Sequence, residues 1–400
     1  MTIEQSFLLQ ILSDHLFQRG TEIPEGLDWT ALLALSKKHE LSPILYDQCK
    51  TAFGAKTEQP AFAALRKQYN LAIRQYLTNQ SAMKELRERF TEANIPYFPV
   101  KGLTVAQYYP EPAFRTMGDV DLVIRHEDHK RIFAVMEALG YTNTVVSEKE
   151  LHFRRFSTVF EMQETLIHDH GADGAQLYAY FSKIWDYAVP QDGSSEYRLD
   201  ANVHFLYLVA HIAKHIKWIG VGFRQFFDLA VLVQRGSALF DWQQIAREAE
   251  RCGLERFLPV CLTLCAEWFG SLNPLPPAQI TEALRRELTE KLFSDGVFGF
   301  HNEDNNLHSL QSTLRRSKAP LPLLKLKTLR HLLFPSRREL MVSDKYASLR
   351  DRPGLLPLVW CKRLLRASRD KRSGKNAVRI LSASRDELRQ RQEFLKSLGL

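Results

Sequence analysis

The sequence predicts an α+β protein in which a small α/β core is inserted between mainly helical regions. Apolar residues recur at helical spacing before residue 95 and again beyond residue 200. Between those stretches lie short runs rich in β-branched and aromatic residues, which are typical of strands. The length of 400 residues and the composition, 45% hydrophobic and 25% charged, exclude a disordered chain and a fibre.

The first region, residues 1–94, is predicted to contain three helices. Residues 3–17 and 28–50 place apolar side chains one helical turn apart. Residues 61–93 contain no Gly or Pro and predict one long helix.

The second region, residues 95–198, is predicted to be the α/β core. Its first strand contains two prolines and is therefore expected at a sheet edge. The last stretch, with a break near Ser157, predicts two strands or one bent strand. The predicted strands and the helices between them cover residues 95–100, 103–109, 120–124, 128–139 and 151–167.

Helical spacing returns in the third region, residues 199–310. Glycines lie near the expected breaks between four helices, over residues 201–218, 223–234, 241–252 and 257–269. Cys261 and Cys265 lie one turn apart in an apolar run, so we expect buried thiols rather than a metal site. Five cysteines without a C-x-x-C pair favour reduced thiols.

The last region, residues 311–400, is strongly basic. It holds 23 Lys and Arg against 7 Asp and Glu, a net charge of +16, which leaves −8 for residues 1–310. Such a segment is suited to nucleic acid, anionic lipid or an acidic partner. A solvated basic face explains the same charge.

The sequence also bears on location. No apolar run approaches the roughly 18 residues that a membrane span needs. The first residues lack the basic and apolar parts of a signal peptide. We therefore expect a cytoplasmic protein with no membrane span.

Two carboxylates, Asp119 and Asp121, stand at the start of the second predicted strand. Residues two apart in a strand point to the same face of the sheet. Hard oxygen donors this close suit Mg²⁺ or Mn²⁺, and metal ions held there can activate a hydroxyl and stabilise a leaving pyrophosphate. The spacing alone is also typical of a solvated strand end.

The residues upstream favour a phosphate site. Gly102 lies between a predicted strand and a predicted helix, where backbone N–H groups approach a phosphate, although a plain turn needs the same glycine. Arg115 lies four residues before Asp119, within reach of triphosphate oxygens or of a structural salt bridge. Lys101 is either a second such cation or a solvated side chain.

A third carboxylate is expected from a neighbouring strand. Glu161 is the leading candidate and Glu164 the alternative. Strand alternation puts Glu161 and Gln163 on one face and Glu164 on the other, so only one of the two acids should face the metal. Its expected role is to bind the metal and to accept the proton of the attacking hydroxyl, and the alternative is a solvated acid.

These residues resemble the uncharacterised nucleotidyltransferase family of the DNA polymerase β-like superfamily. The specific element is the M-G-D-x-D-L core, Met117 to Leu122. The resemblance is broad, and its segments are Lys38–Tyr46, Ile95–Gly102, Arg115–Ile124, Val203–Leu232 with His211, His215 and Asp228, Phe334–Pro335 and Leu355–Pro357.

The resemblance implies a polymerase β-like core with a mixed sheet. By it, Asp119, Asp121 and Glu161 are the catalytic and metal-binding acids. Lys101, Gly102, Arg115 and Gly118 lie on the nucleotide side. Two positions depart from the pattern: Lys101-Gly102-Leu103 replaces a usual Gly-Ser, and Gln163 replaces a usual His.

The predicted function is therefore a Mg²⁺-dependent transfer of a nucleoside monophosphate from an NTP to a hydroxyl acceptor, with release of pyrophosphate. The acceptor class, a protein, a small molecule or RNA, stays open, as do the nucleotide, the oligomeric state and a toxin or biosynthetic role. The alternative is a catalytically inactive nucleotide- or RNA-binding adaptor that uses residues 311–400.

Overall fold

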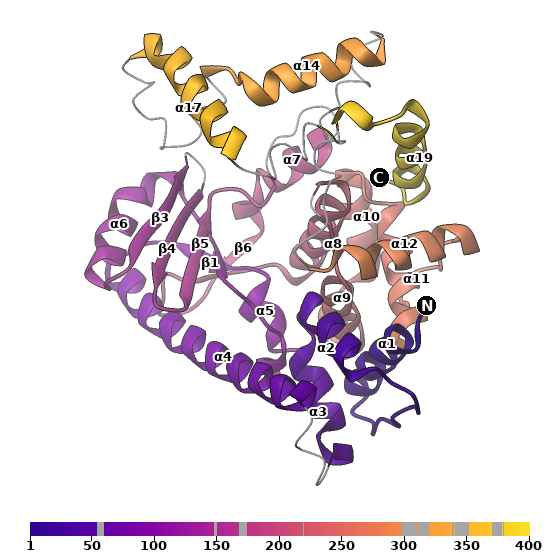
Figure 1. The fold of residues 1–400 in the computed structure, drawn as a ribbon. Helices are drawn as coiled ribbons and strands as arrows, with labels where there is room; N and C mark the ends of the chain where they lie inside the picture. The colour runs from indigo at the N-terminus through magenta and orange to yellow at the C-terminus, as the bar shows by residue number, and fades with distance from the viewer. Residues whose placement is uncertain are drawn as a thin grey trace.

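The computed structural model describes residues 1–53, 60–147, 150–167, 174–218, 220–297, 310, 320–337, 340, 352–369, 378 and 380–400. A five-stranded sheet occupies one side of the body, and helices pack on the other (Figure 1). The fold class is confirmed: a small mixed sheet lies between mainly helical regions.

Helices begin the chain, but there are four before residue 95 rather than the three predicted. They are α1 (Ile3–Leu16), α2 (Trp29–Lys38), α3 (Ser42–Phe53) and α4 (Pro60–Glu92). The stretch predicted as one helix over 28–50 is broken because Glu40 adopts a left-handed φ of 56°, which a helix cannot continue. Pro43 then stands in the first turn of α3, where its missing N–H costs no hydrogen bond.

The sheet has the strand order β1-β2-β5-β4-β3. β2 and β5 are parallel, and the other neighbours are antiparallel, so the sheet is mixed. β1 lies at an edge, as its prolines predicted. The strands of this sheet are β1 (Tyr97–Pro99), β2 (Val120–Ile124), β3 (Thr142–Ser147), β4 (Glu150–Arg155) and β5 (Thr158–Gln163).

The two faces of the sheet differ. One face is apolar and packs against the C-terminal half of α4 and against α6 (His129–Ala138), with Leu122, Phe160 and Met162 fully buried. The opposite face carries Asp121 and Glu161, because side chains alternate along each strand. The apolar face anchors the strands, so the polar face can hold acids.

Helix α4 links the two hydrophobic cores of the body. Its N-terminal half contributes Phe62 and Leu65 to the larger core, and its C-terminal half contributes Leu86 and Phe90 to the core under the sheet. Figure 1 shows α4 running from the sheet to the N-terminal helices. The sheet and the N-terminal helices are thereby held in one position.

The larger core is built mainly by the helices beyond residue 200. These helices are α8 (Ala201–Trp218), α9 (Phe223–Arg235), α10 (Trp242–Cys252), α11 (Phe257–Phe269) and α12 (Glu282–Asp295). Two of them, α8 and α9, lie beside the polar face of the sheet, close to the residues of the candidate site. Cys261 and Cys265 are buried free thiols in α11, as expected.

The helix expected over 103–109 is present as the shorter α5 (Gly102–Ala106), between β1 and β2. Two elements between β5 and α8 were not predicted: α7 (Ala175–Phe181), and a two-stranded ribbon of β6 (Ala188–Pro190) and β7 (Tyr197–Leu199). Each strand of the ribbon has three residues, too few to show a period of two.

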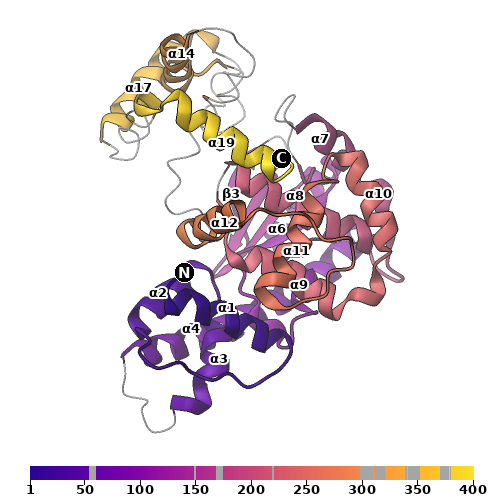
Figure 2. The same cartoon turned by 90° about the vertical axis from the view of Figure 1, so that its right-hand side faces the viewer.

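The basic segment is described in part. Its helices are α14 (Leu321–Leu333), α17 (Leu356–Arg369) and α19 (Arg385–Ser397). Figure 2 shows α14 and α17 apart from the body, with α19 between them and it. Phe394 and Leu395 of α19 belong to the larger core, so the end of the chain packs on the body. None of the helices in the described ranges is long and apolar enough to cross a membrane.

Candidate active site

The acids predicted from separate stretches of sequence meet on two neighbouring strands. In the parallel pairing of β2 with β5, Asp121 lies directly opposite Glu161. Asp119 precedes β2 by one residue. All three side chains line one cleft of about 490 Å³ between the sheet and helices α8 and α9.

Lys101 is fixed beside these acids. Its ammonium donates to Asp121 Oδ1 at 2.7 Å, and its backbone N–H donates to His204 Nε2 on α8 at 3.1 Å. Its φ of 53° lies in the left-handed region, which costs a non-glycine residue free energy. The two hydrogen bonds hold Lys101 in this strained conformation.

Gly102 and Gly118 also line the cleft. A Cβ added to Gly102 would lie 3.4 Å from Met117 Sδ, and one added to Gly118 would meet nothing within 4 Å. Helix α5 begins at Gly102 but has only five residues, so its dipole is small. Any phosphate there would depend on side-chain cations more than on the helix end.

Arg115, predicted to reach the triphosphate or to form a structural salt bridge, forms the salt bridge. Its Nε and Nη2 donate to the two carboxylate oxygens of Asp228 on α9, at 2.9 and 2.8 Å. Tyr109 donates its hydroxyl hydrogen to Asp228 Oδ1 at 2.7 Å. Both charged groups are about 95% buried. The guanidinium still lines the cleft, and a triphosphate contact stays a prediction.

The comparisons with known proteins agree with this geometry. The sequence model of a family described as "Uncharacterised nucleotidyltransferase" matches residues 25–270. The chain belongs to this family. It is therefore a transferase of nucleotidyl groups that uses a nucleoside triphosphate. No curated protein and no solved structure matches the chain.

The acids of this nucleotidyltransferase repel one another. Burial raises the pKa of Asp119, and the charge of Asp121 raises it further. Burial, and then Asp121, raise the pKa of Glu161 to about 7. A divalent cation would compensate this concentration of negative charge. Three carboxylates are also the hard oxygen donors that Mg²⁺ and Mn²⁺ prefer, so the donor set fits such an ion.

Four cations line the cleft, and three are paired: Lys101 with Asp121, Arg115 with Asp228 and Arg224 with Glu40. Lys214 of α8 is the exception, since it has no hydrogen bond or ion pair with any residue within the described ranges. Burial, and then the charge of Lys101, lower its pKa. It is the cation of this cleft that is available to an anionic ligand.

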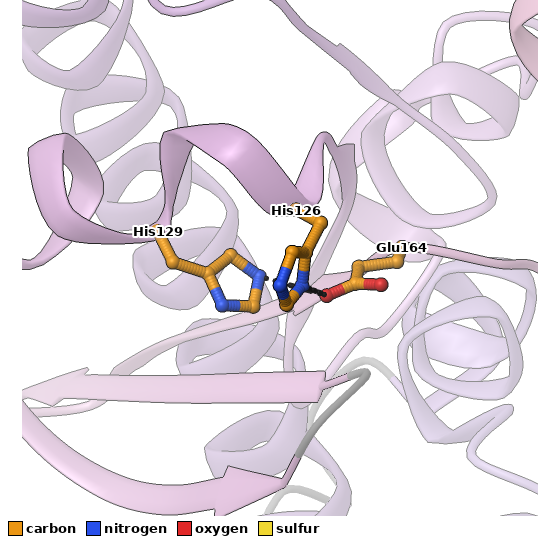
Figure 3. A group of neighbouring side chains, drawn as sticks. All are labelled: His126, His129 and Glu164. Carbon is orange, nitrogen blue, oxygen red and sulfur yellow. Dashed lines mark hydrogen bonds and ion pairs between the residues drawn. The ribbon is translucent and has the colours of Figure 1, made fainter.

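The structure separates the two candidates for the third acid. Glu161 faces Asp121, whereas Glu164 lies past the end of β5 next to His126 and His129 (Figure 3). Strand alternation predicted this separation.

His211 and His215 of α8 also line the cleft, and their Nε2 atoms lie 3.1 Å apart in a hydrogen bond.

Two neighbours of the acids on β4, Glu150 and His152, were not predicted from the sequence. His152 of β4 lies opposite Glu161, and its Nε2 lies 2.7 Å from Glu150 Oε1. A histidine imidazole therefore lies beside Glu161, but on the neighbouring strand β4. Gln163 occupies the position two residues after Glu161, where the resemblance predicts a histidine. The alternation of polar and apolar residues over 150–154 was a signal for this strand face.

Proposed function

We propose that this nucleotidyltransferase moves a nucleoside monophosphate from an NTP to an acceptor hydroxyl with Mg²⁺ or Mn²⁺ held by Asp119, Asp121 and Glu161. The observation that carries the proposal is the convergence of these three acids in one cleft, with Asp121 opposite Glu161. The raised pKa values of Asp119 and Glu161 favour cation binding at this point.

The bound ion would neutralise charge on the triphosphate and lower the pKa of the attacking hydroxyl. The hydroxyl oxygen forms a bond to the α-phosphorus, and the bond from that phosphorus to the bridging oxygen breaks. Pyrophosphate leaves with the electron pair of the broken bond. In this proposal Glu161 accepts the hydroxyl proton.

The other lining residues bind the nucleotide in this proposal. Lys214 contacts the triphosphate, because its ammonium has no partner within the described part of the chain and faces the same cleft as the acids. Lys101 orients Asp121 through their 2.7 Å contact. Gly102 and Gly118 leave room for the nucleotide beside the acids.

The test is label transfer. The full chain is incubated with Mg²⁺ and each α-labelled NTP, with and without cell lysate. We expect wild type and the exposed-loop control Asp192→Asn to transfer label, and Asp119→Asn to lose about 100- to 1,000-fold in rate, on the order of other electrostatic catalytic groups. Nuclease or protease sensitivity of the product identifies the acceptor class. Full activity of Asp119→Asn would contradict the proposal.

The adaptor alternative predicts a different result. RNA binding through residues 311–400 would fall steeply with salt and leave no labelled product. Because α19 contributes to the larger core, truncation at residue 310 would disturb the body. Charge removal at Lys325, Lys327 and Lys362, all outside that core, tests the surface instead. Unchanged RNA affinity in the triple Ala variant would rule out these three lysines as the contact.

A further inference from the structure

A second group of ligand-type side chains lies at the ends of the two central strands. β2 and β5 are parallel, so their carboxyl ends meet at one edge of the sheet. His126 follows β2 closely, His129 begins α6, and Glu164 follows β5 directly. Figure 3 shows the three side chains converging from these elements.

The distances in this cluster are close to those of a metal site. His126 Nδ1 lies 2.7 Å and His129 Nε2 3.1 Å from the same atom, Glu164 Oε1. The three ligand atoms all lie within 4.8 Å of one another. Zn²⁺ with bonds of about 2.0–2.1 Å in tetrahedral geometry holds its ligand atoms about 3.3 Å apart. Small side-chain rotations would give that spacing.

One atom of the cluster is unsatisfied. His129 Nε2 is shielded from solvent and makes no hydrogen bond within the described part of the protein, although it lies near Glu164 Oε1. A buried polar atom without a partner costs about 1–3 kcal/mol. His126, in contrast, hydrogen-bonds to Glu164 through Nδ1. A cation bound to all three side chains would satisfy the His129 nitrogen as well.

The cluster is separate from the catalytic acids. Glu161 lies on the polar face of the sheet, whereas Glu164 contacts His129 on α6, the helix that packs against the apolar face. Two imidazoles and one carboxylate are a donor set that suits Zn²⁺, whereas the oxygen-only acids suit Mg²⁺. The two groups are therefore expected to select different ions.

We propose that His126, His129 and Glu164 bind one Zn²⁺ ion. The ion ties the start of α6 to the end of β5 and thereby fixes the ends of the two strands that carry Asp121 and Glu161. The proposal does not depend on the acceptor or on the nucleotide.

The test is Zn²⁺ binding by the full chain after chelator treatment. The background is Asp119→Asn with Glu161→Gln, which weakens binding at the catalytic acids. Zn²⁺ is titrated in competition with a chromophoric chelator, and Co²⁺ is added separately to record the visible bands of a four-coordinate site. We expect one Zn²⁺ per chain and a higher melting temperature with Zn²⁺.

The variants decide the outcome. Loss of an outer partner of a ligand costs 10–100-fold in metal affinity, so loss of a ligand, in His126→Ala or Glu164→Gln, should cost at least that. The exposed histidine His331 on α14 provides the control His331→Ala, which should bind Zn²⁺ as the background does. Circular dichroism checks the fold of each variant. Equal Zn²⁺ affinity in the background and both ligand variants, or no Zn²⁺ binding at all, would overturn the proposal.

Discussion

Two ion pairs line the same cleft and differ in their hydrogen bonding and in the backbone geometry of the cation. Arg115 and Asp228 join through two hydrogen bonds, and Tyr109 adds a third. Lys101 reaches Asp121 through one hydrogen bond, from a backbone with a left-handed φ. The Asp228 carboxylate accepts three hydrogen bonds, whereas among the described residues the Asp121 carboxylate accepts one, from Lys101, and keeps more acceptor capacity open to the cleft.

These differences indicate which of the two ion pairs stabilises the fold. Burial opposes the charge of both cations, and the facing carboxylates outweigh it, so the pKa of each is raised. A buried pair whose carboxylate accepts three hydrogen bonds holds α9 against the segment before β2. A strained pair with open capacity is typical of a functional site. We therefore expect Asp228 to matter for stability and Asp121 for catalysis.

Matched substitutions of the two acids should separate these roles most strongly. Asp228→Asn leaves Arg115 buried without its counter-charge and should cost about 3–5 kcal/mol of unfolding free energy. Asp121→Asn should cost less, because Glu161 still faces Lys101, yet should lower the transfer rate about 100- to 1,000-fold. Denaturant unfolding and label transfer are measured on both. Equal losses of unfolding free energy in the two variants would contradict the assignment of Asp228 to stability and of Asp121 to catalysis.

Lys214 extends the comparison to a cation without a partner. If it contacts the triphosphate, Lys214→Met should raise the KM for the NTP about 10- to 100-fold, since charge-assisted hydrogen bonds contribute about 1.5–3 kcal/mol. The free energy of unfolding should not fall, because no described ion pair is lost. Lys214→Arg keeps the charge and should restore part of the affinity. An unchanged KM in Lys214→Met would exclude the contact.

The raised pKa of Glu161 predicts a pH dependence in chelator. A carboxyl with a folded pKa of about 7, against an ordinary value of 4.5, contributes stability that is present below pH 4.5 and lost as the pH rises to 7. Buried histidines such as His204 and His215, whose pKa values burial lowers to about 4, add stability as the pH rises over the same range, so Glu161→Gln serves as the reference. Relative to Glu161→Gln, the wild type should lose several degrees of melting temperature between pH 4.5 and 7. If the melting temperature of the wild type instead rose relative to Glu161→Gln over the same pH range, the raised pKa of Glu161 would be contradicted.

The sequence predicted the elements that have a clear period. The strand over 120–124 and the helices over 201–218 and 257–269 match the structure in their bounds. The break near Ser157 separates β4 from β5, and the alternation along β5 put Glu161, not Glu164, on the face of Asp121. These elements are long or strongly patterned, so local sequence decides them.

Other features depend on contacts that no local pattern contains. The break between α2 and α3 depends on the left-handed backbone of Glu40, a conformation that glycine adopts more readily. The pairing of Arg115 with Asp228 joins residues 113 positions apart, so their spacing gave no signal. That Lys214 is available to a ligand is known only from the structure, which shows the carboxylate partners of the other three cations.

Gly102 lies between the two ion pairs and provides the smallest expected effect. A Cβ there would lie 3.4 Å from Met117 Sδ and 3.9 Å from Arg115 Nη1, so the fold accepts Ala with little displacement. Ala favours the first turn of α5 by up to about 1 kcal/mol, which offsets the close contact. Gly102→Ala should thus change the free energy of unfolding by less than about 1 kcal/mol. If the nucleotide approaches this backbone, the KM for the NTP should rise severalfold, whereas Gly20→Ala, in open space far along the chain, should leave it unchanged. An unaltered KM in Gly102→Ala would place the nucleotide away from Gly102 and assign that glycine to the turn alone.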